Sequence, residues 1–367
     1  GFDRSPMFNG RIKSVGPRYC PSVEDKINRF ADKERHQVFV EPEGWSTVEV
    51  YVNGFSTSLP EDIQFNALKS VPGFEDVKFF RPGYAIEYDY FPPTQLKHSL
   101  ETKPIENLFF AGQINGTTGY EEAAAQGLMA GINAHLKINN KPEFILKRNE
   151  AYIGVLIDDL ITKGTEEPYR MFTSRAEFRM LLRQDNADIR LTELSHNIGL
   201  ASYDRYNLVK SKLSKTKKLI DFITKLSVLP SEMNPILENK NSKPISQSMK
   251  LKKLYCRPNI VSEDVLKIKA LNDFINENSI EEEIVEQSEI QIKYSGYIDK
   301  EKSHAEKLNN LESVKIPLAF DYSKLKSLSS EAKCKLEDIK PRTLSQASRI
   351  SGVSPADISA MLVFMGR

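Results

Sequence analysis

The spacing of apolar residues divides this chain into a mixed first part and a helical second part. In about the first 140 residues, short β-branched and aromatic runs alternate with turns, and such runs predict strands at 48–54, 77–80 and 84–91. From residue 150 onward, apolar residues recur with the period of a helix. The pattern therefore predicts an α/β part that is followed by an all-α part.

Several helices are predicted individually. One is expected to begin near Pro60 and to end near Gly73, because proline and acidic residues suit the first turn of a helix. The segment 229–250 is rich in Pro, Asn and Ser and is expected to be a loop. The apolar period predicts further helices at 153–160, 172–184, 204–227, 262–278, 280–291 and 297–312. The buried stripe of the helix at 204–227 is expected to be Leu208, Leu213, Leu219, Ile220 and Phe222.

A glycine-rich turn lies between a short apolar run and an alanine-rich run. The apolar run at 108–110 predicts a buried strand, and the alanine-rich run predicts a helix from Tyr120. Between them stand Gly112, Gly116 and Gly119. Such a turn exposes backbone N–H groups to a ligand, and the positive end of the helix dipole favours negative charge there. The spacing is neither G-x-G-x-x-G nor a phosphate-binding loop, so a cofactor cradle and an ordinary strand-to-helix turn both remain open.

Charge is unevenly distributed along the helical part, although the net charge of the chain is only +1. Residues 201–260 carry 13 Lys and Arg against 4 Asp and Glu, whereas residues 261–290 carry 9 Asp and Glu against 2 Lys. Two interpretations remain open: a pair of solvated helices, or a basic surface for RNA with an acidic flank.

The rest of the composition indicates a cytoplasmic protein without a membrane segment or a metal site. The three cysteines, at 20, 256 and 334, form neither a zinc spacing nor a disulfide framework. The five histidines are scattered and form no metal-ligand spacing. No apolar run approaches the roughly 18 residues of a membrane-spanning helix.

Cys20 stands where a thiolate would be favoured. Arg18 precedes it by two positions, and the residues from Pro21 onward predict the start of a helix. Both a cation and a helix N-terminus lower the pKa of a thiol from its usual value of about 8.5. From the residues alone, a reactive Cys20 and a buried structural Cys20 both remain open.

Four stretches carry a resemblance to a known protein family. The closing FAD-binding segment of the glucose-inhibited division protein A family, also called the GidA or MnmG family, resembles the stretch at 111–127, AGQINGTTGYEEAAAQG. Further segments of that family resemble, in the same order, GPRYCPSVEDK at 16–26 and EPYRMFTSRAEFRMLLRQDNADIRLTE at 167–193. The C-terminal stretch at 345–367, SQASRISGVSPADISAMLVFMGR, also resembles that family. The resemblance covers essentially the whole chain and is thinnest between about 205 and 340.

The resemblance implies the C-terminal part of a two-dinucleotide-binding flavoprotein fold, followed by a helical C-terminal domain. The N-terminal FAD fold of the family is expected to lie outside this chain, because the first residues already resemble mid-family sequence. The implied divisions are the end of an inserted NAD-contacting domain at 1–40, the closing part of the FAD-binding domain at 41–145, a helical domain at 146–275, and a C-terminal helical region for tRNA and GTPase docking at 276–367.

The activity that the resemblance implies is tRNA modification by a flavoenzyme. The family adds a carboxymethylaminomethyl group to carbon 5 of the wobble uridine of tRNA. It uses FAD, NADH and methylenetetrahydrofolate, works with an MnmE-type GTPase, and forms a homodimer. Two alternatives stay open: a flavin oxidoreductase that acts on a small molecule, and a tRNA- or partner-binding fragment that is inactive by itself. The isolated chain is expected to oxidise no NADH.

The resemblance also implies roles for residues near the start of the chain. Cys20 is the implied catalytic residue, either as a nucleophile on the pyrimidine ring or in proton handling, together with a second cysteine outside this chain. Lys26 is implied to contact a phosphate of NAD. The alternative for Lys26 is a surface salt bridge with Glu24 or Asp25. The implied NAD contacts are Gly16, Pro17, Arg18, Tyr19 and Lys26.

Further roles are implied for the glycine-rich turn and for an arginine-rich stretch. Arg175, Arg179 and Arg183 fall at helical spacing, and the resemblance implies that they contact the phosphates of tRNA. The alternative is ion pairing with Glu166, Glu167, Glu177 and Asp185. The implied FAD contacts are Gln113, Gly116, Thr118, Gly119 and Tyr120.

Overall fold

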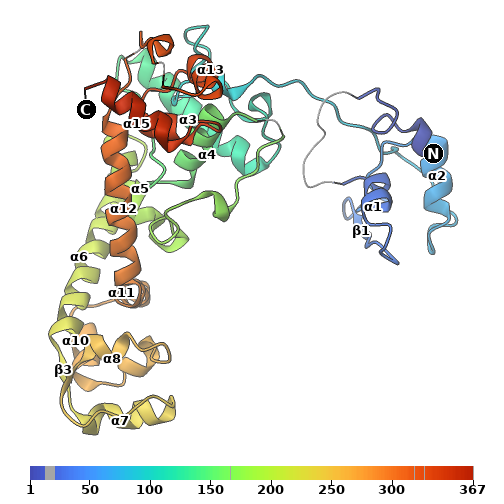
Figure 1. Cartoon of the computed structure of the whole chain (residues 1–367). Helices are drawn as coiled ribbons and strands as arrows, with labels where there is room; N and C mark the ends of the chain where they lie inside the picture. The colour runs from blue at the N-terminus through green and yellow to red at the C-terminus, as the bar shows by residue number, and fades with distance from the viewer. Residues whose placement is uncertain (13–20, 166, 318, 326, 367) are drawn as a thin grey trace. The chain divides into compact units, whose positions relative to one another are not determined.

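The computed structural model describes residues 1–12, 21–165, 167–317, 319–325 and 327–366 (Figure 1). Two compact units divide the chain. One comprises Gly1–Phe144 and Asp159–Met171, and the other comprises Ile145–Asp158 and Phe172–Arg367. Helix α4 (Tyr152–Lys163) contributes residues to both units and confirms the helix predicted at 153–160.

The first unit combines helices with a small antiparallel sheet. Strands β1 (Phe39–Pro42) and β2 (Val50–Asn53) pair with Phe39 opposite Asn53, so the strand predicted at 48–54 is confirmed. The helices and 3-10 turns of this unit are η1 (Phe2–Arg4), α1 (Val23–Arg29), α2 (Glu61–Lys69), η2 (Pro93–Gln95), η3 (Gly112–Asn115) and α3 (Tyr120–Ile138). The helices predicted from Tyr120 and near Pro60 are confirmed as α3 and α2, although α2 ends before Gly73.

Three strands that the sequence predicts for the first part are not formed. The runs at 77–80 and 84–91 belong to no strand, and the run at 108–110 makes a single bridge between Phe109 and Glu101. A strand needs a hydrogen-bonded neighbour along its length. The runs at 77–80 and 84–91 form no bridge, and the run at 108–110 pairs only briefly with 100–102, where the Thr102 N–H donates to the Leu108 carbonyl at 2.8 Å. Leu108 is exposed, although the sequence predicts a buried strand here.

The second unit is helical apart from one very short sheet among its described residues. The helices predicted at 204–227, 280–291 and 297–312 are confirmed as α6, α11 and α12, and the one predicted at 262–278 is divided into α9 and α10. The elements of this unit after α4 are η4 (Thr173–Arg175), η5 (Gln184–Asn186), α5 (Ala187–Asn197), α6 (Tyr203–Lys225), β3 (Ser227–Val228), α7 (Pro230–Asn239), β4 (Met249–Lys250), α8 (Leu251–Tyr255), α9 (Ser262–Val265), α10 (Lys269–Glu277), α11 (Glu282–Lys293), α12 (Ser295–Ser313), η6 (Tyr322–Lys324), α13 (Ser330–Ile339), α14 (Leu344–Arg349) and α15 (Pro355–Phe364).

The helix predicted at 172–184 is wrong. This stretch contains only the short turn η4, and η5 begins at its end. The backbone N–H groups of Met180 and Leu181 donate to the carboxylate of Glu301, at 2.9 and 3.1 Å. A distant side chain therefore takes the donors that a local helix would have used.

The loop predicted at 229–250 is also wrong, because helix α7 occupies much of it. Pro230 takes the first helical position, where its missing N–H costs nothing. Met233, Ile236 and Leu237 follow at helical spacing and are buried in the core. Their burial outweighs the weak helix propensity of the surrounding Pro, Asn and Ser residues.

The buried face of α6 differs from the predicted stripe. Leu219 is buried as expected, but Leu208 and Leu213 are 65% and 42% exposed. The residues that α6 actually buries are Val209, Lys212, Thr216, Leu219 and Ile223. Lys212 is accommodated on this face because Asp188 of α5 and Glu283 of α11 pair with it, which the sequence of α6 alone does not show.

Candidate functional site

The glycine-rich turn joins η3 to the N-terminus of α3 and has the backbone geometry of a tight cradle. Gly112 and Gly116 adopt left-handed φ angles of 85° and 73°, which favour glycine. Gly119 is the N-cap of α3, and no side chain caps this helix by a hydrogen bond. The first N–H groups of a helix have no partner within the helix, so the turn presents donors and the positive end of a dipole.

One buried glutamine holds the turn together. Gln126, on α3, is fully buried, and its Oε1 accepts hydrogen bonds from Gly112 N–H at 3.1 Å and Asn115 Nδ2 at 2.8 Å. Its Nε2 donates to Thr117 Oγ1 at 2.9 Å, and Thr117 in turn donates to the Gly112 carbonyl at 2.9 Å. This closed network fixes one conformation, because breaking it would leave buried polar groups unpaired.

The segment that follows α4 lies alongside this turn. The Tyr169 N–H donates to the Gly116 carbonyl at 2.9 Å, and Tyr169 forms a parallel bridge with Thr117. The Met171 N–H donates to Glu122 Oε1 at 2.7 Å. Two of the stretches that carry the family resemblance therefore meet at the turn.

Side chains larger than glycine do not fit at two positions of the turn. A Cβ on Gly119 would lie 1.6 Å from Glu122 Oε2 and 2.9 Å from Arg170 Nε. A Cβ on Gly116 would lie 2.6 Å from Thr165 Oγ1. A larger residue at either position would therefore force the neighbouring Glu122 or Thr165 side chain to move.

Polar atoms without partners surround the turn. Buried polar groups in native proteins are nearly always paired with protein, water or a ligand. The turn thus offers atoms that a polar ligand can satisfy, and this fits the FAD that the resemblance implies. The buried atoms without a hydrogen-bond partner among the described residues of this region are Asn115 Oδ1, Thr118 Oγ1, Glu122 Oε2 and Thr165 Oγ1.

The structure brings the predicted FAD contacts together on one short stretch. Gly116 and Gly119 are buried, Thr118 is half-buried, and Gln113 and Tyr120 are exposed. Their contact with FAD stays a prediction.

Sequence reasoning missed three residues of the site. These are the buried members of the network, Asn115, Thr117 and Gln126. A signal was present for Gln126, which is a polar residue in an alanine-rich helix and stands one helical turn after Glu122.

Most of the predicted NAD contacts, and the predicted catalytic Cys20, lie outside the described residues. Of the five NAD contacts, only Lys26 can be placed, and its Nζ donates to the Gly54 carbonyl at 2.7 Å. The helix predicted to start at Pro21 is confirmed as α1, whose N-cap Ser22 accepts from the Asp25 N–H at 3.1 Å. The residues outside the described part are Gly16, Pro17, Arg18, Tyr19 and Cys20.

Glu24 is a buried carboxylate on α1. It therefore does not form the surface salt bridge with Lys26 that was the alternative to a phosphate contact. Its Oε1 accepts hydrogen bonds from the Ser58 N–H at 2.7 Å and the Ser58 hydroxyl at 2.6 Å. Burial alone would raise the pKa of Glu24, but the hydrogen bonds from Ser58 outweigh it and lower that pKa below its usual range.

The three predicted tRNA-contacting arginines do not share a helix face, because no helix forms at 172–184. Arg183 pairs with Asp185 at 3.0 Å and donates to the Met180 carbonyl at 2.5 Å, as the ion-pair alternative expected. Arg179 is exposed and Arg175 is half-buried. Their contact with tRNA stays a prediction.

The basic and acidic stretches of the sequence partly pair with each other. Helices α6 and α11 contact each other. Lys212 donates to Asp188 at 2.9 Å and also pairs with Glu283, and Lys215 pairs with Glu281 at 2.7 Å. Burial alone would lower the pKa of Lys212, but these carboxylates raise it above its usual value. The exposed cations of α6 are Arg205, Lys210, Lys217, Lys218 and Lys225.

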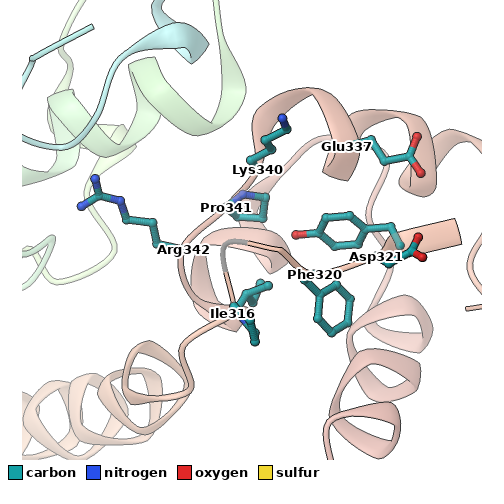
Figure 2. Close-up of a pocket in the computed structure, with 9 residues that line it drawn as sticks. Ile316, Phe320, Asp321, Glu337, Lys340, Pro341 and Arg342 are labelled. Carbon is teal, nitrogen blue, oxygen red and sulfur yellow. The ribbon is translucent and has the colours of Figure 1, made fainter. Parts of the chain in front are cut away.

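A cavity of about 340 Å³ lies in the C-terminal helical region (Figure 2). Burial raises the pKa of its Tyr322 to about 12, so this hydroxyl stays neutral at physiological pH. None of the residues predicted for the site lines this cavity. Its lining residues are Ile316, Pro317, Phe320, Asp321, Tyr322, Glu337, Lys340, Pro341 and Arg342.

The described residues offer neither a metal site nor a membrane-spanning helix. They contain no group of three His, Cys, Asp or Glu side chains arranged to bind a metal. Their helices include none with the length and apolar character that crossing a membrane requires.

Three family models match most of the chain, with a gap at 143–202. The family of glucose inhibited division protein A matches residues 1–142. The C-terminal helical domain of the tRNA modifying enzyme MnmG/GidA matches 203–302, and its C-terminal helical bundle matches 304–367.

Curated relatives and a solved structure point the same way. The tRNA uridine 5-carboxymethylaminomethyl modification enzymes MnmG of Flavobacterium johnsoniae and Christiangramia forsetii are 72% and 71% identical over the whole chain, which spans 59% of their length. The structure of Aquifex aeolicus GidA in its form II crystal matches with a TM-score of 0.79 and 47% identity, over 98% of this chain and 56% of that one. The chain belongs to the MnmG/GidA family.

Proposed function

We propose that this chain is part of a flavoenzyme that adds a carboxymethylaminomethyl group to carbon 5 of the wobble uridine of tRNA. The relatives that bear this activity in their name are about 70% identical, and this chain spans 59% of their length. The observation that carries the proposal is the turn from Gly112 to Glu122, where rigid backbone, a helix N-terminus and unpartnered buried polar atoms coincide.

The turn is the proposed FAD-binding part of this chain. The backbone N–H groups of Thr118, Gly119 and Tyr120 would hold the flavin, and Gln113 would contact the cofactor with a side chain that both donates and accepts. When bound, FAD supplies the electron transfer of the reaction. The residues of the turn would hold the cofactor, and the hydrogen bonds of Gln126 keep the backbone of the turn in one conformation. The positive end of the α3 dipole favours negative charge at this place.

The reaction needs further components in this proposal. NADH is the reductant and methylenetetrahydrofolate is the one-carbon donor. Lys26, with Gly16, Pro17, Arg18 and Tyr19, contributes to NAD binding, and Cys20 acts as nucleophile or proton donor at the pyrimidine ring. The whole protein acts in the cytoplasm as a homodimer with an MnmE-type GTPase.

The tRNA surface of the proposal includes Arg175, Arg179, Arg183 and the exposed cations of α6. Exposed Lys and Arg side chains bind phosphates mainly by charge and release counterions from the RNA. Because that release becomes less favourable as the salt concentration rises, the affinity falls with added salt. Arg179 and Lys217 are exposed. Arg183 contributes less, because Asp185 already neutralises it.

The FAD assignment is tested by titrating a protein of the relatives' full length that contains this chain, followed by flavin fluorescence. Gly119→Ala should abolish FAD binding, because its Cβ would overlap the Glu122 carboxylate. Gly127→Ala is the matched control, since a Cβ there meets nothing within 4 Å and the residue is also on α3. Equal affinity of the two variants would remove the turn from the FAD site. A second titration, with the 367-residue chain alone, asks whether this chain binds FAD by itself. Tight binding would show that it forms a complete cradle.

The tRNA assignment is tested by modification and binding. Cys20→Ser should abolish modification while leaving tRNA affinity nearly unchanged, and persisting modification would make Cys20 structural. The affinity for tRNA should fall steeply with salt. A protein that binds FAD but shows no salt-dependent tRNA binding would instead be a flavin oxidoreductase acting on a small molecule.

A further inference from the structure

Glu122 is a buried acid whose two carboxylate oxygens have different surroundings. Only 2% of the residue is exposed. Its Oε1 accepts hydrogen bonds from the Met171 N–H at 2.7 Å and from Arg170 Nε at 3.3 Å. Its Oε2 is buried without a hydrogen-bond partner among the described residues. A charged group in such a place is costly unless something stabilises it.

The unpartnered oxygen points at the N-terminus of α3. The ideal Cβ position of Gly119, the N-cap, lies 1.6 Å from Oε2 and 2.9 Å from Arg170 Nε. Glu122 therefore does more than add a favourable charge to the first turn of the helix. Together with Arg170 it places an ion pair directly against the backbone that the proposed flavin would contact.

We propose that Glu122 and Arg170 are positioning residues that set the electron affinity of the flavin at this turn, an inference that rests on the proposed FAD site. Reduction of a flavin places negative charge on its ring. A buried carboxylate nearby opposes that charge and a guanidinium favours it, and both effects are strong where water is excluded. Glu122 thus moderates the positive potential that α3 and Arg170 supply.

The Glu122→Gln substitution separates the effect of the charge from that of the structure. Glu122→Gln keeps an oxygen that can accept from the Met171 N–H but removes the negative charge. The equilibrium constant for reducing the bound flavin should rise about tenfold, which is a potential about 30 mV more positive for a two-electron couple. Glu121→Gln is the matched control, because Glu121 is the adjacent acid of the same helix turn but is exposed.

The measurement is a dye-referenced reduction of FAD bound to the full-length protein. A positive shift in Glu122→Gln that is absent from Glu121→Gln supports the proposal, and equal shifts overturn it. Arg170→Gln should shift the potential in the opposite direction. If Glu122→Gln loses FAD, Arg170→Gln decides the matter, since an unchanged potential there overturns the proposal. Failure of the unmodified protein to bind FAD would instead overturn the cofactor assignment and this inference with it.

Discussion

Single buried polar residues fix the local structure around the turn. Gln126 bonds at once to the backbone of η3, to Asn115 and to Thr117. None of these bonds follows from the propensity of a glutamine in a helix. Each depends on the chain returning through a glycine turn to face the same side of α3.

Gln126→Ala should therefore destabilise the protein well beyond the usual effect of a surface substitution. It leaves the buried Gly112 N–H without an acceptor and the buried Thr117 Oγ1 without the donor that Gln126 supplied, at a cost of about 2 to 4 kcal/mol in the free energy of unfolding. Urea unfolding measures this. Gln113→Ala is the control, since Gln113 is exposed in the same turn, and equal unfolding midpoints would contradict the role of the network.

Glu101 makes the stability of the first unit depend on pH. Burial alone would raise the pKa of this carboxyl, but hydrogen bonds from Lys137, Lys97 and the Asn107 N–H outweigh burial and lower it from 4.5 to about 2. Because the folded pKa is the lower one, the contribution of Glu101 to stability is complete above the unfolded pKa and is lost as the pH falls through the folded pKa.

The advantage of the native protein over Glu101→Gln should thus be largest above about pH 5 and shrink toward pH 2. Melting temperatures across this range measure it. Glu106→Gln replaces an exposed acid nearby and should show no such dependence. A difference that stays constant with pH would show that the ionised form of Glu101 contributes nothing specific.

At the scale of elements, helix α6 shows that an amphipathic period does not identify its buried face. The leucines at 208 and 213 face solvent, while Lys212 and Thr216 are buried. Lys212 finds Asp188 and Glu283, but the Thr216 hydroxyl has no hydrogen-bond partner among the described residues. Contacts with neighbouring helices therefore decide which face of α6 is buried, and they bury the Thr216 hydroxyl without a partner among the described residues.

Thr216→Val should stabilise this part of the protein by about 0.5 to 1 kcal/mol, because it removes a buried hydroxyl without changing the volume much. Thr216→Ala, which removes the hydroxyl but also leaves a cavity, should destabilise it. Chemical unfolding of the three proteins separates the two effects. A destabilised valine variant would mean that the hydroxyl is paired in solution.

At the scale of the whole molecule, ion pairs join segments that are remote in the sequence. Asp158 accepts from Arg349 Nη2 at 2.8 Å, across 191 positions, and from Arg148 Nη1 at 3.0 Å. All three residues belong to the second unit. The pairing therefore links helix α14 to α4 within that unit.

Asp158→Asn should lower the free energy of unfolding by about 3 kcal/mol, because two largely buried guanidinium groups lose their shared counter-charge. Asp299→Asn, at an exposed position, is the control. Unfolding followed by circular dichroism compares the two. Similar midpoints would show that the other carboxylates near Arg148 compensate fully.

The elements that could be predicted from the sequence are those that local interactions stabilise, and the elements that could not depend on residues far away in the sequence. Helices α3, α4, α11 and α12 could be predicted because their apolar period is a local property. Helix α7 could not, because its stability comes from the burial of Met233 and Leu237 in a core formed by other elements. The stretch at 172–186 could not either, because Glu301 reaches it from 120 positions away.

The sequence by itself determined the family, the helical character of the second part, and the glycine-rich turn at the start of α3. These depend on residue identity and short spacing, which the chain carries at every stage of folding. Only the tertiary structure decided that Gln126 closes the turn, that Glu122 and Arg170 lie against Gly119, and that Arg183 pairs with Asp185. Such contacts depend on where distant or differently oriented side chains come to rest, and this is set when the whole core packs.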